Sequence, residues 1–116
     1  MADTLPEIKE QADILADLLR EHKGQDVSLL DLRKINNWTD FFIIATASSR
    51  THMDGMEKYL KEYCRENEIE ILGSSRREPE DEWRLIDLGW AVVHLMTVNT
   101  REFYDLERLW HSSGSK

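Results

Sequence analysis

The stretch WRLIDLGWAVVHLM, residues 83–96, constrains the fold more than any other part of the chain. Its residues alternate with the period of two that is typical of β-strands, and Leu88–Gly89 stands between the two halves as a turn. We therefore predict a β-hairpin. Its second strand carries Ala91, Val93 and Leu95 on one face, and this uniformly aliphatic set indicates a core face.

The opposite face of the hairpin is chemically mixed. Besides Val92, alternation gathers five side chains of different character there: Trp83, Leu85, Asp87, His94 and Met96. Two interpretations stay open from the residues alone. Either the last helix covers this face and His94 is hydrogen-bonded to a neighbour, which composition slightly favours, or the face binds a protein partner. Trp and Met are both enriched in protein–protein contacts.

Three more strands are predicted outside the hairpin. Phe41–Ile44 is a continuous apolar run of β-forming residues, which suits a central strand covered on both faces. Shorter strands are expected at residues 27–32 and 69–72, and residues 73–82 are expected to form a polar loop. The strand at 41–44, the next helix and the strand at 69–72 would form a right-handed β-α-β unit. The hairpin adds antiparallel strands, so the sheet is mixed.

Three helices are predicted from apolar residues at helical spacing. The first begins with a capping box at Thr4–Glu7. The second begins at Ser48 or Ser49 and ends near Asn67. Its apolar stripe consists of Met53, Met56, Leu60 and Cys64. The third is capped by Asn99. Its predicted core residues are Phe103, Leu106 and Trp110.

These elements predict an α/β protein, a small sandwich of one five-stranded mixed sheet and three helices. A length of 116 residues fits one domain over residues 1–116, with a flexible tail from about residue 111. The N-terminal sequence lacks a signal or transit pattern, no apolar run is long enough to cross a membrane, and a single cysteine excludes an internal disulfide. We therefore expect a cytoplasmic protein.

The net charge of −8 disfavours general binding to nucleic acids, because it repels phosphate backbones, and it favours a basic protein partner. Ser48, Ser49, His52 and Asp54 lie close together, but the sequence has no G-x-S-x-G elbow, so the serines are interpreted as helix caps. Neither metal-ligand spacing nor a glycine-rich phosphate loop is present. We expect no enzyme activity, no metal and no cofactor.

Four stretches taken together resemble the ribosome silencing factor family, also called the Iojap family. They are TDFFIIATASS at 39–49, WRLIDLG at 83–89, VVHLM at 92–96 and REFYDLERLW at 101–110. The resemblance covers roughly residues 5–110. The chain departs from the family in the sequence GSSRREPEDEW at 73–83, where many members have a Glu-Gly pair, and at Ala47, where a glycine is common.

The resemblance implies a fold similar to nucleotidyltransferases without known enzyme activity. It also implies binding to a large-subunit ribosomal protein, the fourteenth in bacterial nomenclature, at the surface where the small subunit docks. Such binding would block subunit joining and damp translation when nutrients are short. The alternative hypothesis is a degenerate nucleotidyltransferase that binds a nucleotide at the Ser48–Ser49 helix start. A homodimer, formed through a sheet edge or the tryptophan face, is compatible with the silencing hypothesis.

The resemblance also implies roles for individual residues. Trp83 falls where the family has its interface tryptophan. Arg101 and Tyr104 match an R-x-x-Y pattern that either borders the contact or locks the last helix to the sheet. The predicted partner-binding residues are Trp83, Leu85, Asp87, His94, Met96, Arg101 and Tyr104.

Overall fold

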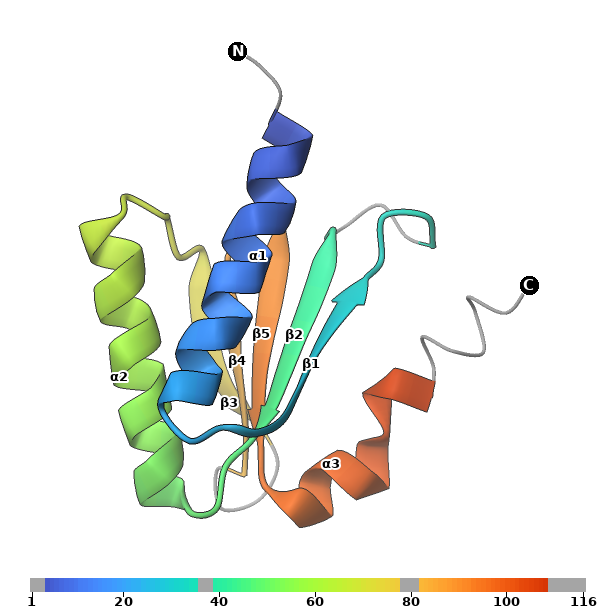
Figure 1. Cartoon of the computed structure of the whole chain (residues 1–116). Helices are drawn as coiled ribbons and strands as arrows, with labels where there is room; N and C mark the ends of the chain where they lie inside the picture. Colours follow the sequence, from blue (N-terminus) through green and yellow to red (C-terminus); the bar gives the residue numbers. More distant parts are fainter. Residues whose placement is uncertain (1–3, 36–38, 78–81, 109–116) are drawn as a thin grey trace.

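A computed structural model describes residues 4–35, 39–77 and 82–108 (Figure 1), with the side chains of 4–7, 76 and 77 left aside. The helices are α1 (Thr4–Glu21), α2 (Arg50–Glu66) and α3 (Val98–Tyr104). The strands are β1 (Gln25–Asp31), β2 (Phe41–Thr46), β3 (Gly73–Arg77), β4 (Trp83–Asp87) and β5 (Ala91–Met96). No helix in these described ranges is long and apolar enough to cross a membrane.

The five strands form one mixed sheet in the order β1-β2-β5-β4-β3. Only the central pair, β2 and β5, is parallel, and the other three pairs are antiparallel. All six residues of β5 are buried, as are five of the six in β2. This confirms the predicted α/β class, the mixed five-stranded sheet, the three helices and the buried strand that begins at Phe41.

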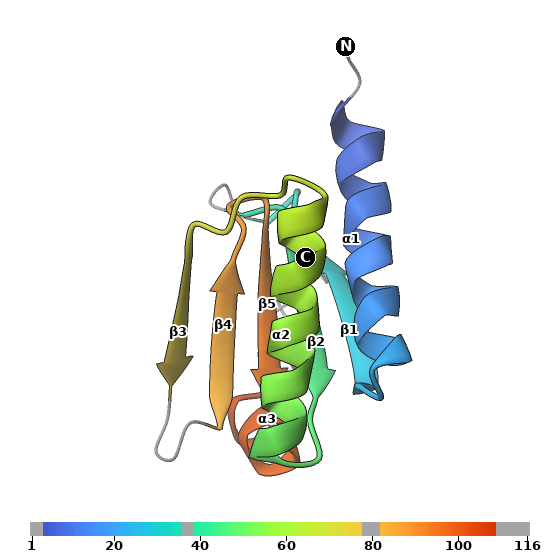
Figure 2. The same cartoon turned by 90° about the vertical axis from the view of Figure 1, so that its left-hand side faces the viewer.

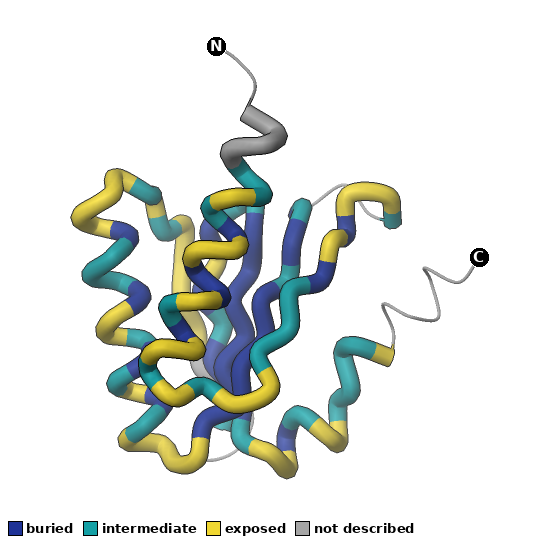
Figure 3. Tube along the Cα trace, in the orientation of Figure 1, coloured by how far each residue is buried: buried dark blue, intermediate teal, exposed yellow. Residues whose placement is uncertain are grey.

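Two helices cover one face of the sheet, and α3 lies on the other (Figures 1 and 2). The main core fills the space between the sheet and α1 and α2, and Figure 3 shows its buried positions in dark blue. The predicted apolar stripe of α2 lies in it, with every member at most 1% exposed. Each fully buried side chain of this kind contributes roughly 1.5–3 kcal/mol to stability.

A smaller apolar cluster lies on the α3 side of the sheet. Its buried members are Leu30, Leu32, Ile44 and Met96. Half-buried aromatic and aliphatic side chains pack against them, including Phe42, Trp83, Tyr104 and Leu106. The mixed face of the hairpin is therefore partly covered, because α3 and the turn after it reach across to β4 and β5.

The predicted strand at 69–72 is wrong, because these residues form an irregular segment that joins α2 to the sheet, where the Leu72 N–H donates to the carbonyl of Asp87 at 2.8 Å. Ile69 and Ile71 pack against the main core, which explains their apolar character. The third strand is instead Gly73–Arg77, inside the predicted polar loop. It pairs with β4 at the edge of the sheet, where pairing needs backbone groups rather than apolar side chains. Since β5 and β4 separate β3 from β2, the predicted β-α-β unit is not a neighbouring parallel pair.

The helix boundaries agree in part with the predictions. Ser49 caps α2 and Asn67 ends it, as expected. The cap of α3 is Thr97 rather than Asn99, and the helix ends at Asp105 in a left-handed conformation with φ 45°. Phe103 was predicted as core but is 78% exposed. Trp110 and the tail from 111 lie outside the described residues.

Arg84 is an ionic residue on the core face of β4, where its side chain is 3% exposed. It donates to Glu57 of α2 at 3.0 Å and also pairs with Asp54 of the same helix. A buried charge must be paired to be tolerated. The hairpin is thus tied to α2 by ion pairs as well as by apolar packing.

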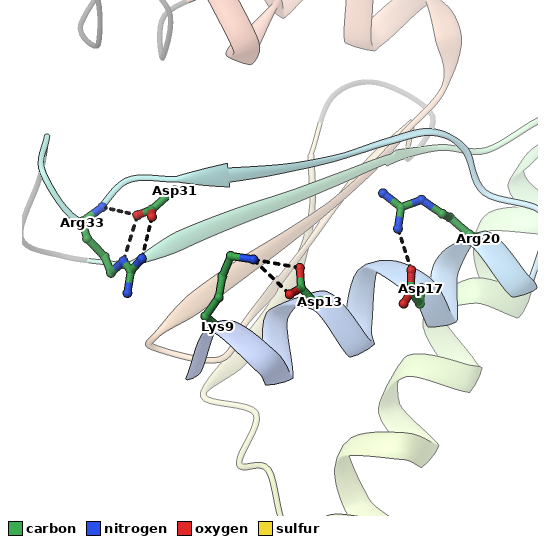
Figure 4. A network of polar contacts seen from close by, with 6 residues as sticks. All are labelled: Lys9, Asp13, Asp17, Arg20, Asp31 and Arg33. Carbon is green, nitrogen blue, oxygen red and sulfur yellow. Dashed lines mark hydrogen bonds and ion pairs between the residues drawn. The ribbon is translucent and has the colours of Figure 1, made fainter. Parts of the chain in front are cut away.

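The outer face of α1 and the end of β1 carry ion pairs in solvent (Figure 4). Within α1, Lys9 pairs with Asp13 and Arg20 pairs with Asp17. Both pairs are largely exposed, so each contributes at most about 1 kcal/mol. The pairs matter for the surface charge of α1, because Lys9 and Arg20 are each neutralised by an acid of their own helix.

Candidate functional site

The register of β4 and β5 places the mixed residues of the hairpin on one face. Trp83 lies opposite Met96, Leu85 opposite His94, and Asp87 opposite Val92. This confirms the grouping predicted from alternation. We call this surface the Trp83 face, and define it as Trp83, Leu85, Asp87, His94 and Met96.

The residues of the Trp83 face differ in depth. Met96 is 0% exposed and His94 is 4% exposed, so both lie beneath the surface. Trp83 and Leu85 are half-buried and Asp87 is exposed. A partner could therefore touch Trp83, Leu85 and Asp87 directly, whereas His94 and Met96 support them from below. That His94 and Met96 belong to a contact surface stays a prediction, in which their role would be mainly to support the exposed residues.

The Trp83 side chain is held from two sides. Its indole Nε1–H donates to Nδ1 of His94 at 3.1 Å, so Nδ1 must be unprotonated. Its ring lies 4.8 Å from the Tyr104 ring, centroid to centroid, at an interplanar angle of 44°. The His94 ring is held in turn by an edge contact with Phe42. These contacts fix one orientation of the indole before any partner arrives.

Arg101 anchors α3 to the sheet. Its guanidinium donates to Thr46 at 2.9 Å and to Ser28 at 3.0 Å. It also donates twice to Glu107, at 3.2 and 2.7 Å, and the Ser28 hydroxyl donates to the same carboxylate at 2.6 Å. Two roles were considered for Arg101: bordering a contact surface, or locking the last helix to the sheet. This geometry supports the second role. Tyr104, one turn further along α3, is thereby placed against Trp83.

Phe103 is a residue that sequence reasoning assigned wrongly. It meets Tyr104 edge to face at 4.9 Å, and its ring stands in solvent beside the Trp83–Tyr104 pair. A signal was available in the sequence. Phe103 and Tyr104 are neighbours on a helix, and because neighbours point about 100° apart, only one of them can face the sheet.

A shallow hollow of about 410 Å³ adjoins the Trp83 face. Its floor includes Leu85, Val92 and His94, and β3 forms one wall through Ser74 and Ser75. Asp87 lies at its end and accepts a hydrogen bond from the Gly89 N–H at 2.8 Å, so this carboxylate also holds the hairpin turn. The hollow extends the accessible surface beyond Trp83 toward the sheet edge.

The start of α2 was the alternative site, for a nucleotide. Ser49 Oγ is used as a cap, accepting from His52 N–H at 3.0 Å. A separate hollow of about 370 Å³ lies at this helix start, and the Glu82 carboxylate, which lines it, accepts from the hydroxyls of Thr97 and Thr100. A carboxylate in this position repels a phosphate group. This arrangement therefore argues against nucleotide binding there.

Ser48 and His52 have the separation of a nucleophile and its base, with Oγ 3.1 Å from Nδ1. The imidazole is already engaged, however. Its Nδ1 accepts from the Ser48 backbone N–H at 3.0 Å, and its Nε2–H donates to the carbonyl of His22 at 2.8 Å. The histidine thus joins two loops rather than activating a hydroxyl. Within the described part of the chain, no three His, Cys, Asp or Glu side chains are placed to hold a metal ion.

Comparisons with known proteins identify the family of the chain. The chain matches the family described as "ribosomal silencing factor during starvation" over residues 5–116. Relatives named as ribosomal silencing factors include one from Chromobacterium violaceum, 33% identical over 90% of this chain and 84% of the relative. Another, from Haemophilus influenzae, is 35% identical over 84% of this chain and 95% of the relative. A mouse relative is named "mitochondrial assembly of ribosomal large subunit protein 1"; it is 35% identical over 88% of this chain, which spans 46% of that relative.

Solved structures give the same answer for the fold. A crystal structure of a Chromobacterium violaceum protein superimposes with a TM-score of 0.80 at 32% identity, over 88% of this chain and 85% of that one. One from Bacillus halodurans gives 0.76 at 31% identity, over 88% and 94% of the two chains. By sequence and by fold, the chain belongs to the ribosomal silencing factor family, whose members regulate translation.

Proposed function

We propose that this chain silences translation by binding the fourteenth protein of the large ribosomal subunit and blocking the approach of the small subunit. The observation that carries the proposal is family membership over residues 5–116. We further propose that it acts in the cytoplasm. Some relatives carry names that place them in other compartments, such as the chloroplastic Iojap protein of maize.

The Trp83 face is the contact surface in this proposal. Its indole is half-buried and fixed by His94 and Tyr104, so little side-chain entropy is lost on binding. Tryptophans of this kind often dominate an interface energetically. The exposed Phe103 ring and the hollow beside Leu85 would widen the contact on either side.

Charge supports a protein target rather than ribosomal RNA. The chain has a net charge of −8 and would be repelled by an RNA backbone. A basic ribosomal protein would attract it and increase the association rate. In this proposal the chain supplies no catalysis, and its effect is steric.

The test is co-sedimentation of the purified chain with isolated large and small ribosomal subunits. We expect migration with the large subunit only, and a loss of affinity of roughly tenfold or more for Trp83→Ala. Tyr59→Ala is the matched control, since it removes a 47%-exposed aromatic ring from α2, on the opposite side of the sheet. Circular dichroism would confirm that each variant is folded.

Two results would contradict the proposal. Migration with neither subunit would exclude the silencing function for this chain. Equal binding by the Trp83→Ala and unsubstituted chains would leave the function standing but remove the Trp83 face from it. A subunit-joining assay with added small subunit then tests the steric mechanism separately.

A further inference from the structure

A second concave surface lies away from the Trp83 face. It is formed where the N-terminal half of α1 meets the segment after α2 and the turn between β4 and β5 (Figure 1). We call it the α1 groove. Its volume is about 540 Å³, within the range of sites that hold small ligands or peptide side chains.

The walls of the α1 groove are apolar and open to solvent. Leu72 is 59% exposed and Ile14 is 42% exposed, and Trp90 is half-buried and packs against the main core. Ile14 and Leu72 are two of the five large apolar residues exposed in the described ranges. Apolar side chains gathered in a concavity with a polar rim are typical of an interaction site.

The rim of the α1 groove is acidic. Glu10, Glu68 and Glu70 line it and are exposed, and none forms an ion pair with another described residue. The α1 cations do not neutralise them, because Lys9 and Arg20 are paired with acids of their own helix (Figure 4). The rim therefore presents three carboxylates that no described cation pairs with.

Gln11 adds a polar feature to the groove wall. The Oε1 atom of its side chain is buried and accepts no hydrogen bond from any residue within the described ranges. A buried carbonyl oxygen of this kind is normally satisfied. A bound segment that carries a hydrogen-bond donor, such as a lysine ammonium or an arginine guanidinium, would satisfy this oxygen if the Gln11 side chain turned toward the groove.

We propose that the α1 groove binds a basic amphipathic segment of a partner protein. Its apolar side chains would lie between Ile14 and Leu72, and its Lys or Arg side chains would meet the glutamates of the rim. An amphipathic helix that places its apolar face in a groove is a common recognition mode. A second copy of this chain fits less well, because it carries the same net charge of −8. The groove shares no lining residue with the Trp83 face.

The probe is a fluorescent 18-residue peptide with leucine at positions i, i+3, i+4 and i+7 and lysine elsewhere, used at 150 mM salt. Two control peptides have the same composition in scrambled order, or glutamate in place of lysine. We expect binding of the first peptide alone. NMR chemical-shift changes on titration should concentrate in the backbone amides of residues 8–14 and 68–72 and at the indole N–H of the Trp90 side chain.

Charge variants test the rim. The rim variant replaces Glu10, Glu68 and Glu70 with glutamine. The matched control replaces three glutamates outside the groove: Glu21, Glu62 and Glu102. Both remove the same charge, but interactions beyond about 8 Å are screened at this salt concentration. We expect about a tenfold loss of affinity in the rim variant and less than about threefold in the control.

Apolar variants test the walls. Leu72→Ser should weaken peptide binding at least fivefold. Val98→Ser, at an apolar residue outside the groove that is 48% exposed, should leave the affinity for the peptide unchanged. The proposal is overturned by equal losses in the two charge variants, by equal binding of the scrambled peptide, by shifts that map to another surface, or by no binding at all. None of these results depends on ribosome binding, so they leave the proposed function untouched.

Discussion

Replacing Arg101 with methionine removes the residue that holds α3 against the sheet while keeping most of its apolar stem. The substitution deletes four hydrogen bonds, two to Glu107 and one each to Thr46 and Ser28. The Arg101 side chain is 12% exposed and that of Glu107 is 29% exposed, so the pair is shielded from water only in part.

The expected cost follows from that burial. Breaking a fully buried ion pair costs about 3–5 kcal/mol, because the remaining charge stays in a poor environment. Here Glu107 reaches solvent and keeps the hydrogen bond from the Ser28 hydroxyl. We therefore expect a decrease of about 2 kcal/mol in the free energy of unfolding. For a domain of this size that corresponds to a fall in Tm of roughly 8 °C.

Urea denaturation followed by circular dichroism measures this change. A double-mutant cycle with Glu107→Gln should give a coupling energy of about 1–2 kcal/mol. Arg101→Lys should be intermediate, since an ammonium keeps the charge but cannot reproduce the planar fork. The control is Arg20→Met on α1, which breaks a pair whose side chains are 51% and 67% exposed (Figure 4) and should cost less than about 1 kcal/mol.

A coupling energy below about 0.5 kcal/mol would refute the reasoning, because it would show that Arg101 and Glu107 act independently. So would equal destabilisation by Arg101→Met and Arg20→Met. If the lock exists, Arg101→Met should also weaken large-subunit binding, since Tyr104 would no longer be held against Trp83.

Three further predictions concern stability and reactivity. Burial raises the pKa of the Cys64 thiol and shields its sulfur. In the native chain a disulfide reagent should therefore react with Cys64 only as fast as the protein unfolds. Absorbance measurements with and without urea would test this rate. Hydrogen bonding from Arg33 lowers the pKa of Asp31 below 3.8. The pair therefore stabilises the fold above that pH, and its contribution is lost as the pH falls through the lowered pKa. Asp31→Asn should flatten this part of an acid-denaturation curve. Gly89→Ala should destabilise the fold by about 1 kcal/mol or more, because φ is +86° and a new Cβ would meet Leu72 at 3.0 Å; unchanged urea denaturation would show that the turn relaxes instead.

The sheet was predictable where side chains report burial. Phe41 begins a strand covered on both faces, and the alternation around Gly89 marks a hairpin. The edge strand at Gly73–Arg77 was not predictable in this way. Its residues are held by backbone pairing to β4, and pairing at an edge imposes no apolar pattern. Ile69 and Ile71 carry such a pattern because their side chains pack against the core, although their backbone lies outside the sheet.

The candidate site was predictable in membership but not in depth. Alternation placed Trp83 and Met96 on one face correctly, but it contains no information on what covers that face. The cover is α3, whose position is set by hydrogen bonds from Arg101 to residues 55 and 73 positions earlier in the chain. Phe103 was misplaced because the predicted apolar stripe assumed a continuous helix. The left-handed Asp105 interrupts the helix, so Leu106 is out of phase with Phe103.

The parallel pairing of β2 with β5 has a consequence for how the chain acquires its structure. Phe41 pairs with Ala91 and Thr46 with Met96, so the centre of the sheet joins segments 50 residues apart. Such contacts of high sequence separation slow folding, because a long loop must close before they form. During synthesis, β2 would leave the ribosome long before its central partner. Until β5 emerges, β2 can pair with β1 along one edge, but its other edge has no native partner, and this apolar edge must avoid non-native pairing until most of the sequence has been made.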